Sequence, residues 1–345
     1  LWFWPIEQAE LLPTRQQFLT EIGVLLGQIP GFEKKLEQGE LDALMVEVSG
    51  QKIPVQQDEL ELDETVVNVD QLCADSKRLS LVRNITEQRK FFHWELEFCD
   101  LFQERGGFDL ILGNPPWVKV GWNEGDLLSE RNPAFAIRSL SGPQIANARE
   151  EQLENSAQRV AYFSEFEEFA GTQSFLNAAQ NYHVLVGQKA NLYKSFLPRA
   201  WAIATAQGVT GFLHPEGVYD DSKGGILRHE IYTRLRYHLQ FQNEKKLFAI
   251  GNQFKFSINI FSSPKSEILF NNIANLFSPF TVDSCFSHNG CGPVPGIKSG
   301  GDEDDDSKAE WTIVGHHDRI VLVDTPLLGL FAKLYDEAGT PATQA

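Results

Sequence analysis

Residues 106–120 read GGFDLILGNPPWVKV. Residues 108–113 form a short apolar run of the kind found in buried parallel β-strands. Asn114, two prolines and Trp117 follow directly. Proline lacks the backbone donor that would extend a sheet, so the strand is expected to end there. The sequence predicts a strand that carries an amide, a rigid backbone and a flat ring to one edge of a sheet.

The groups at this strand end suit an amino group that carries two hydrogens. In open α/β sheets, ligands bind beyond the carboxyl ends of the strands. Asn114 offers a side-chain acceptor, and the carbonyl of Pro115 is followed by Pro116, which has no N–H. Trp117 offers a face on which a base can stack, worth roughly 1–3 kcal/mol. These features together describe the recognition of an adenine flipped out of its helix.

Composition places the chain among globular proteins. It has 345 residues, of which 42% are hydrophobic and 22% charged, enough for one large or two modest domains. No run approaches the roughly 18 apolar residues of a membrane helix, so no membrane association is expected. A disulfide framework or a metal site is not expected either, because the cysteines form no CxxC pair. These cysteines are Cys73, Cys99, Cys285 and Cys291. A reducing, cytoplasmic setting fits this pattern.

The net charge is strongly negative. The formal value is −17, and the run Asp302–Asp306 contributes to it as an expected solvated loop. Nucleic-acid-binding proteins usually carry basic patches. The acidity therefore argues against DNA binding by most of the chain, but it does not exclude a local groove.

The order of elements predicts an α/β protein. After the motif, a long polar stretch precedes a strand, a helix and two further strands, which is the alternation typical of α/β folds. The expected organisation is a mostly helical lead-in over residues 1–105, the catalytic half of an α/β core over 106–262 with a helical insertion at 121–187, a linker with an acidic loop over 263–310, and the start of a C-terminal recognition-type domain over 311–345.

The motif and its flanks resemble a known family. Asn-Pro-Pro followed by an aromatic residue is the signature of adenine-N6 DNA methyltransferases, which use S-adenosylmethionine. Four segments are similar to Eco57I-type methylase domains of combined restriction–modification (type IIG-like) proteins: LWFWP (1–5), FFHWELEFCDLFQERGGFDLILGNPPW (91–117), KANLYKSFLPRAWAIATAQGVTGFLHPEGVYDD (189–221) and HHDRIVLVDTPLLGLFAKLYDEAGTP (316–341). The resemblance implies part of a Rossmann-like, S-adenosylmethionine-dependent methyltransferase core with helical insertions and the start of a further domain.

The resemblance also implies catalytic roles for the motif, Asn114, Pro115, Pro116 and Trp117. The Asn114 amide and the Pro115 main-chain carbonyl would polarise the adenine amino group. Trp117 would stack on the flipped base. No strong general base is needed, because the amino nitrogen becomes acidic as it gains the methyl group, and the enzyme contributes mainly positioning.

Further contacts are expected from three other segments. Phe248 would pack on the second side of the base, although the alignment also permits Phe254 or Phe256. His214 ends a strand at the same sheet edge and is expected to contact the substrate. Tyr193 is a candidate cofactor contact, and core packing is the alternative for it.

The glycine-rich turn that binds S-adenosylmethionine in the family is not found in this sequence. Each glycine cluster has the wrong spacing or the wrong place: Gly23, Gly27 and Gly31; Gly106 and Gly107; Gly224 and Gly225. The chain is therefore expected to be an N-terminally truncated fragment. Its cofactor-binding half is expected upstream of Leu1, and a specificity domain after Ala345.

Three functions stay open at this point. The first is a segment of a site-specific methyltransferase that acts on a flipped adenine in double-stranded DNA, in restriction–modification or phage defence. The second is a catalytically inactive fragment or scaffold that lacks the cofactor-binding motif. The third is an N-methyltransferase that acts on protein glutamine or RNA. The sequence does not specify the DNA target, a fused nuclease, cofactor binding by this chain alone, or the oligomeric state.

Overall fold

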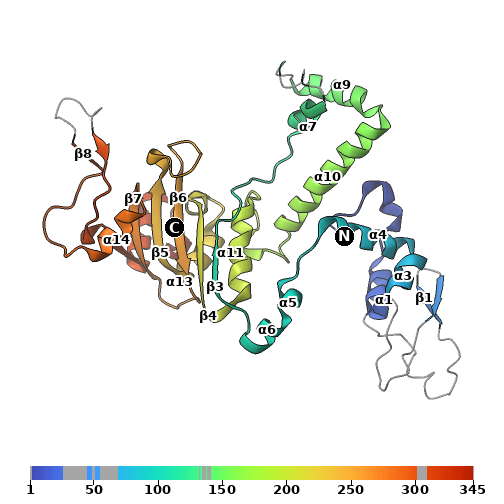
Figure 1. Cartoon of the computed structure of the whole chain (residues 1–345), viewed down its shortest axis with the longest axis horizontal. Helices are drawn as coiled ribbons and strands as arrows, with labels where there is room; N and C mark the ends of the chain where they lie inside the picture. Colours follow the sequence, from blue (N-terminus) through green and yellow to red (C-terminus); the bar gives the residue numbers. More distant parts are fainter. Residues whose placement is uncertain are drawn as a thin grey trace. The chain divides into compact units, whose positions relative to one another are not determined.

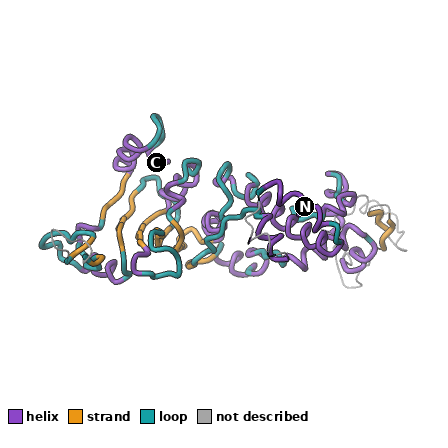
Figure 2. The backbone as a smooth tube through the Cα atoms, turned by 90° about the horizontal axis from the view of Figure 1, so that it is seen from above, coloured by secondary structure: helices purple, strands orange, loops and turns teal. Residues whose placement is uncertain are grey.

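The computed structural model describes residues 2–25, 45–48, 51–54, 69–131, 133, 137, 141–300 and 309–344. The chain divides into two compact units, one within residues 1–92 and 122–172 and the other within 93–121 and 173–345. Figure 1 gives the elements along the chain. Figure 2 shows that the first unit is mostly helical, whereas the long strands belong to the second.

The first unit joins two helical stretches that are distant in sequence. Its elements are η1 (Ile6–Leu11), α1 (Arg15–Leu25), β1 (Met45–Val48), β2 (Gln51–Pro54), α3 (Val69–Asp75), α4 (Lys77–Arg89), α7 (Glu124–Arg131), α9 (Gly142–Leu153) and most of α10 (Ser156–Asn177). Arg89 and Glu168 form an ion pair of 2.5 Å between α4 and α10. The expected helical lead-in and helical insertion thus pack together in one unit.

The second unit holds the main sheet. Its elements are α5 (Trp94–Glu97), α6 (Cys99–Arg105), β3 (Phe108–Gly113), η2 (His183–Leu185), α11 (Leu192–Ile203), β4 (Ala204–Pro215), α12 (Gly217–Asp220), α13 (Gly225–Arg234), β5 (Leu235–Gln242), η3 (Asn243–Lys245), β6 (Lys255–Phe261), β7 (Leu269–Leu276), α14 (Phe280–Ser287), β8 (Lys298–Ser299), β9 (Glu310–Trp311), η5 (His317–Arg319), β10 (Val321–Asp324), α15 (Thr325–Tyr335) and η6 (Ala342–Gln344).

The sheet is mixed, with six strands in the order β10-β7-β5-β6-β4-β3. The pairs β3–β4 and β5–β7 are parallel, and the other three pairs are antiparallel. It follows that β3, β4, β5 and β7 run in one direction and end at the same edge. Helices connect β3 to β4 and β4 to β5, which confirms the expected α/β class.

Each face of the sheet has its own core. On one face, α11, α13 and α15 cover a cluster that contains Leu197 and Leu227, both fully buried. On the other face, α14 covers a second cluster built from β5, β6 and β7, in which Ile273 and Leu276 are fully buried. Trp117 contacts both clusters. The motif is therefore anchored where the two cores meet.

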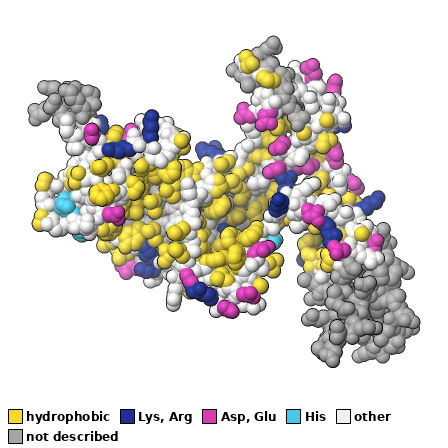
Figure 3. Space-filling model, viewed as in Figure 1, with side chains coloured by type: hydrophobic (Ala, Val, Ile, Leu, Met, Phe, Trp, Pro, Cys, Tyr) yellow, Lys and Arg dark blue, Asp and Glu magenta, His cyan; other side chains and the backbone are white. Residues whose placement is uncertain are grey.

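The prediction that residues 108–113 form a parallel strand is confirmed, but the prediction that this strand is buried is wrong. Among the described residues, β3 pairs only with β4 and forms an edge of the sheet. Leu110 is 58% exposed and Leu112 71% exposed. An apolar run does not reveal whether a strand is central or at an edge. Figure 3 shows hydrophobic side chains over a broad area of the sheet on the face in view.

The expected linker over residues 263–310 is also corrected. Strand β7 and helix α14 lie within it, and β7 is paired on both sides in the main sheet. Strand β10, expected in a new domain, pairs with β7 in the same sheet. Turn-forming residues surround these short elements, and for this reason the sequence pattern did not predict a strand or a helix here. The acidic run Asp302–Asp306 lies outside the described residues.

The segment before the motif fixes the start of β3. The rings of Trp94, Phe98 and Phe102 surround Phe108 at centroid distances of 5.6, 5.3 and 5.9 Å. Gly107 has φ of +144°, and a Cβ there would lie 2.4 Å from the carbonyl oxygen of Ile203. Only glycine fits this close approach. Trp94 thus belongs to a structural segment that leads into β3.

Candidate functional site

The motif leaves the carboxyl end of β3 as a short tip. Asn114 is exposed, and its side chain has no hydrogen-bond partner among the described residues. Pro115 is buried and Pro116 is exposed. Trp117 is half-buried, and its Nε1 donates to the carbonyl of Leu213 at 3.4 Å. Because Leu213 lies near the end of β4, this bond holds the ring against the neighbouring strand.

The chain after Trp117 is tied to the start of α11. Lys119 and Asn191 form an antiparallel bridge. The N–H of Leu192 donates to the carbonyl of Val118 at 2.9 Å. The motif and the start of α11 are therefore held as neighbours, although about 70 residues separate them in the sequence.

Trp117 packs into an aromatic cluster with Phe248 and Phe256. The ring centroids of Trp117 and Phe248 are 5.8 Å apart at 59°, and those of Trp117 and Phe256 are 6.0 Å apart at 34°. A base sandwiched between two rings needs roughly 7 Å between parallel planes, twice the ~3.5 Å contact distance of carbon atoms. In this conformation, Trp117 and Phe248 touch each other and leave no such space.

The structure separates the three phenylalanines that the alignment permitted. Phe248 is half-buried against Trp117, and Phe256 also contacts Trp117 but is 2% exposed. Phe254 is 55% exposed. Phe248 is therefore the ring of the three that combines contact with Trp117 and partial exposure.

Asn243 holds the loop that carries Phe248. Its side chain is fully buried at the end of β5, where Nδ2 donates to the carbonyls of Phe248 and Ile250, each at 3.0 Å. Its Oδ1 accepts from the N–H of Phe248 at 3.0 Å. One amide thus fixes the path of the loop between β5 and β6. No sequence motif marks Asn243; its one signal is a polar residue directly after the alternating strand.

His214 lies in the core, which corrects its expected contact with a substrate. The residue is fully buried, and its ring stacks on Tyr193 at a centroid distance of 5.4 Å. Its Nδ1 lies 2.9 Å from the carbonyl of Pro215, and its Nε2 lies 3.0 Å from Nδ2 of Asn259. Burial lowers the pKa of His214 to about 4. A neutral ring that donates from Nδ1 and accepts at Nε2 fits this arrangement.

Tyr193, the candidate cofactor contact, is 2% exposed. Burial raises the pKa of its hydroxyl above the usual value. The ring packs with Leu197 and Phe212 in the core beneath α11, α13 and α15. Of the two alternatives for Tyr193, the structure therefore favours core packing.

A buried polar network lies at the ends of β4 and β5. Glu216 accepts hydrogen bonds from His238 Nε2 at 3.2 Å and from Gln240 Nε2 at 2.8 Å. His238 Nδ1 lies 2.7 Å from Oδ1 of Asn272. Burial by itself would raise the pKa of Glu216, but the hydrogen bonds and the nearby charge of His238 outweigh it and lower the pKa to about 2. The network joins β5 to β7 and to Glu216, the residue that follows β4.

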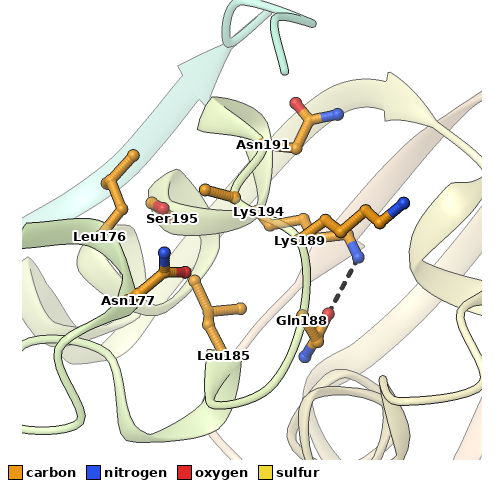
Figure 4. A pocket seen from close by; sticks show the side chains of 9 residues that line it. Leu176, Asn177, Leu185, Gln188, Lys189, Asn191, Lys194 and Ser195 are labelled. Atoms are coloured by element: carbon orange, nitrogen blue, oxygen red, sulfur yellow. Dashed lines mark hydrogen bonds between the residues drawn. The ribbon is translucent and has the colours of Figure 1, made fainter. Parts of the chain in front are cut away.

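The hollow beside the start of α11 does not fit S-adenosylmethionine. Figure 4 shows Asn191, Lys194 and Gln188 around it. It encloses about 200 Å³ including open solvent, and its enclosed part holds about one water, whereas pockets for small ligands span roughly 300–1,000 Å³. Lys194 Nζ is bound to Gln188 and Asp221. Asn191 Oδ1 is buried without a hydrogen-bond partner, which fits one water and not a nucleoside.

The described residues offer neither a metal site nor a membrane span. No group of three or more His, Cys, Asp or Glu side chains in that part of the chain could hold a metal ion. None of the helices described is both long and apolar enough to cross a membrane.

Residues 40–139 match the model of a family described as Eco57I restriction-modification methylase. The match includes strand β3 and the motif. It confirms the resemblance to this family over that stretch, which is 100 of the 345 residues. No curated protein matches the chain.

Two solved structures are similar to the chain, both at low sequence identity and with a low TM-score. The methyltransferase subunit of the type I restriction-modification system from Streptococcus thermophilus is 14% identical, with a TM-score of 0.27, over 59% of this chain and 34% of that one. A nuclease-deletion mutant of the Type ISP restriction-modification enzyme LlaGI, in complex with a DNA substrate mimic, is 14% identical, with a TM-score of 0.26, over 61% of this chain and 14% of that one. The chain therefore spans about a third or less of the length of these proteins.

Proposed function

We propose that the strand end at Asn114–Trp117 is the base-binding part of a site-specific DNA methyltransferase that acts on the N6 amino group of a flipped adenine. The exposed amide of Asn114 carries the proposal, because it has no hydrogen-bond partner among the described residues and belongs to the same tip as Trp117. The family match of residues 40–139 supports DNA as the substrate and restriction–modification or phage defence as the setting.

The tip would offer two hydrogen-bond acceptors to the amino group. The amide oxygen of Asn114 would accept one N6 hydrogen, and the carbonyl of Pro115 would accept the other. Two accepted hydrogen bonds increase the electron density on the nitrogen and make it a better nucleophile. Because Pro115 is buried, the base must approach so closely that it reaches this carbonyl together with the Asn114 amide. The contribution of these residues is positioning.

The second ring, Phe248, would contact the base after a local movement. Trp117 and Phe248 touch at a centroid distance of 5.8 Å, so a base enters between them only when one ring swings away. The Phe248 ring is the one more suited to move, by rotation of its side chain alone, because no hydrogen bond holds it, whereas the Trp117 ring is tied to the carbonyl of Leu213.

By the resemblance, the methyl donor would be S-adenosylmethionine. The hollow beside Asn191 is too small for it. The proposal therefore assigns base binding to this site and assigns no cofactor contact to Tyr193 or its neighbours.

The test is a comparison of two duplexes by fluorescence anisotropy. One duplex carries an adenine opposite an abasic site, which favours an extruded base; the other carries purine, which lacks the amino group, at the same position. We expect tighter binding of the adenine duplex, by roughly tenfold for about 1–1.5 kcal/mol of hydrogen bonding. Asn114→Ala should abolish this preference, and Asn84→Ala, which removes an exposed amide on α4, should keep it. Equal affinity of the unmodified chain for both duplexes would refute the proposal.

A second candidate function is a non-catalytic scaffold. The small hollow beside Asn191 is the observation that favours it, since a methyltransferase must also bind its methyl donor. Isothermal titration of the 345-residue chain with S-adenosylmethionine separates the two. Binding followed by labelled methyl transfer to DNA would contradict the scaffold, and transfer to a glutamine peptide or RNA in preference to DNA would favour the third function class.

A further inference from the structure

We infer that the β5–β6 loop, taken as residues 243–255 with the first residue of β6 included, is a preformed DNA-contacting element in which lysines bind phosphates and exposed Phe254 contacts bases. This inference rests on the proposed function and names a second part of its DNA-binding surface. Figure 1 shows the loop at the ends of β5 and β6.

The loop differs from the rest of the chain in charge. It contains Lys245, Lys246 and Lys255 and a single acidic residue, Glu244, within a chain whose net charge is −17. All three lysines are exposed, and none of them forms an ion pair among the described residues. A basic patch of this kind on an acidic protein directs a polyanion to one place on its surface.

The loop also exposes apolar side chains that a water-facing turn does not need. Phe254 is 55% exposed, Leu247 40% and Ile250 36%. Aromatic side chains on a basic surface are typical of single-strand and flipped-base contacts, because every base has a face that can stack. Lysines and an aromatic ring thus occur together in one loop, at the sheet edge where β3 also ends.

The loop lies beside the proposed base site and has a defined conformation. Its Phe248 contacts Trp117 at 5.8 Å, and both belong to the same unit of the structure. Three hydrogen bonds of Asn243 at 3.0 Å fix its main chain. A loop that is already ordered loses little conformational entropy on binding, which favours a binding role.

The experiment is a salt titration of duplex DNA binding, followed by fluorescence anisotropy, with two matched triple variants. One variant is Lys245→Gln/Lys246→Gln/Lys255→Gln. The control is Lys90→Gln/Lys265→Gln/Lys333→Gln, which removes the same charge from exposed sites and includes Lys90, a residue with positive φ like Lys246. Each phosphate contact adds about 0.9 to the slope of log affinity against log salt. We expect the loop variant to reduce the slope by about 2–3 and the control to leave it unchanged.

Phe254→Ala provides an independent test of the base contact. We expect roughly tenfold weaker binding of single-stranded DNA with an unchanged salt slope, because the ring carries no charge. An equal slope for the loop variant and its control would overturn the inference, as would unchanged binding by Phe254→Ala. Failure of the proposed function has a different signature: adenine and purine duplexes then bind equally while the loop variant still lowers the slope.

Discussion

Replacement of Asn243 by alanine should loosen the β5–β6 loop without unfolding the sheet. The substitution removes three hydrogen bonds of 3.0 Å between a fully buried amide and the loop main chain. At roughly 1 kcal/mol of net stabilisation for each, the loss is about 3 kcal/mol. Since 1.4 kcal/mol is tenfold, the equilibrium for local opening of the loop should rise by about 100-fold.

Hydrogen–deuterium exchange with mass spectrometry measures this opening directly. Peptides that cover residues 244–254 should exchange about 100-fold faster in Asn243→Ala, while peptides from β4 stay unchanged. Asn252→Ala is the matched control, because Asn252 lies in the same loop but is exposed and makes one hydrogen bond of 3.3 Å to Glu244. Equal exchange in the two variants would refute the assignment of Asn243 as the residue that holds the loop.

Three further predictions concern single side chains. Trp117→Ala should weaken binding of the adenine duplex by roughly 1–3 kcal/mol, while Trp117→Phe keeps most of the affinity, as read by anisotropy; equal losses would contradict a stacking role. Leu197→Ala should cost about 2–5 kcal/mol in urea unfolding because Leu197 is fully buried, whereas Phe196→Ala, at 44% exposure, should cost under about 1 kcal/mol. Acidification should destabilise the protein through His214, because the pKa of its ring is about 4 in the fold and about 6.5 in the unfolded chain. The unfolded chain therefore binds a proton that the folded protein does not. The contribution of His214 to the free energy of unfolding is fully present above about pH 6.5 and is lost between about pH 6.5 and about pH 4. The loss between about pH 7 and about pH 5 is about 2 kcal/mol, and a His214→Gln variant with the same loss would show that another group is responsible.

Local patterns in the sequence were sufficient to predict the motif strand and the α/β class of the fold. The run before Asn114 ends where the prolines require it to end, and it lies parallel to the next strand. The position of the strand within the sheet was not predictable, because hydrophobicity reports the nature of the side chains and not the number of neighbouring strands. Only the pairing of β3 with β4 identifies it as an edge.

The candidate site was predictable at the motif and not around it. Residue type and position at the end of a strand were enough to predict Asn114 and Trp117 as candidate base-binding residues. His214 ends the neighbouring strand as expected. Because side chains alternate between the two faces of a strand, that of His214 lies on the face covered by α11, α13 and α15, where it stacks on Tyr193. Asn243 acts through hydrogen bonds to residues five and seven positions ahead, a turn geometry that sequence spacing does not specify.

The unpaired edge of β3 has a consequence for the protein in solution. Its outer N–H and C=O groups have no partner strand among the described residues, and Leu110 and Leu112 project beside them. Such an edge is a template on which another copy can add as a strand. We expect the scattering mass of the purified chain to rise with concentration, and we expect Leu112→Lys to suppress the rise. DNA-binding curves are therefore best recorded at the lowest protein concentrations that give signal, where strand addition between copies does not compete with the motif beside it.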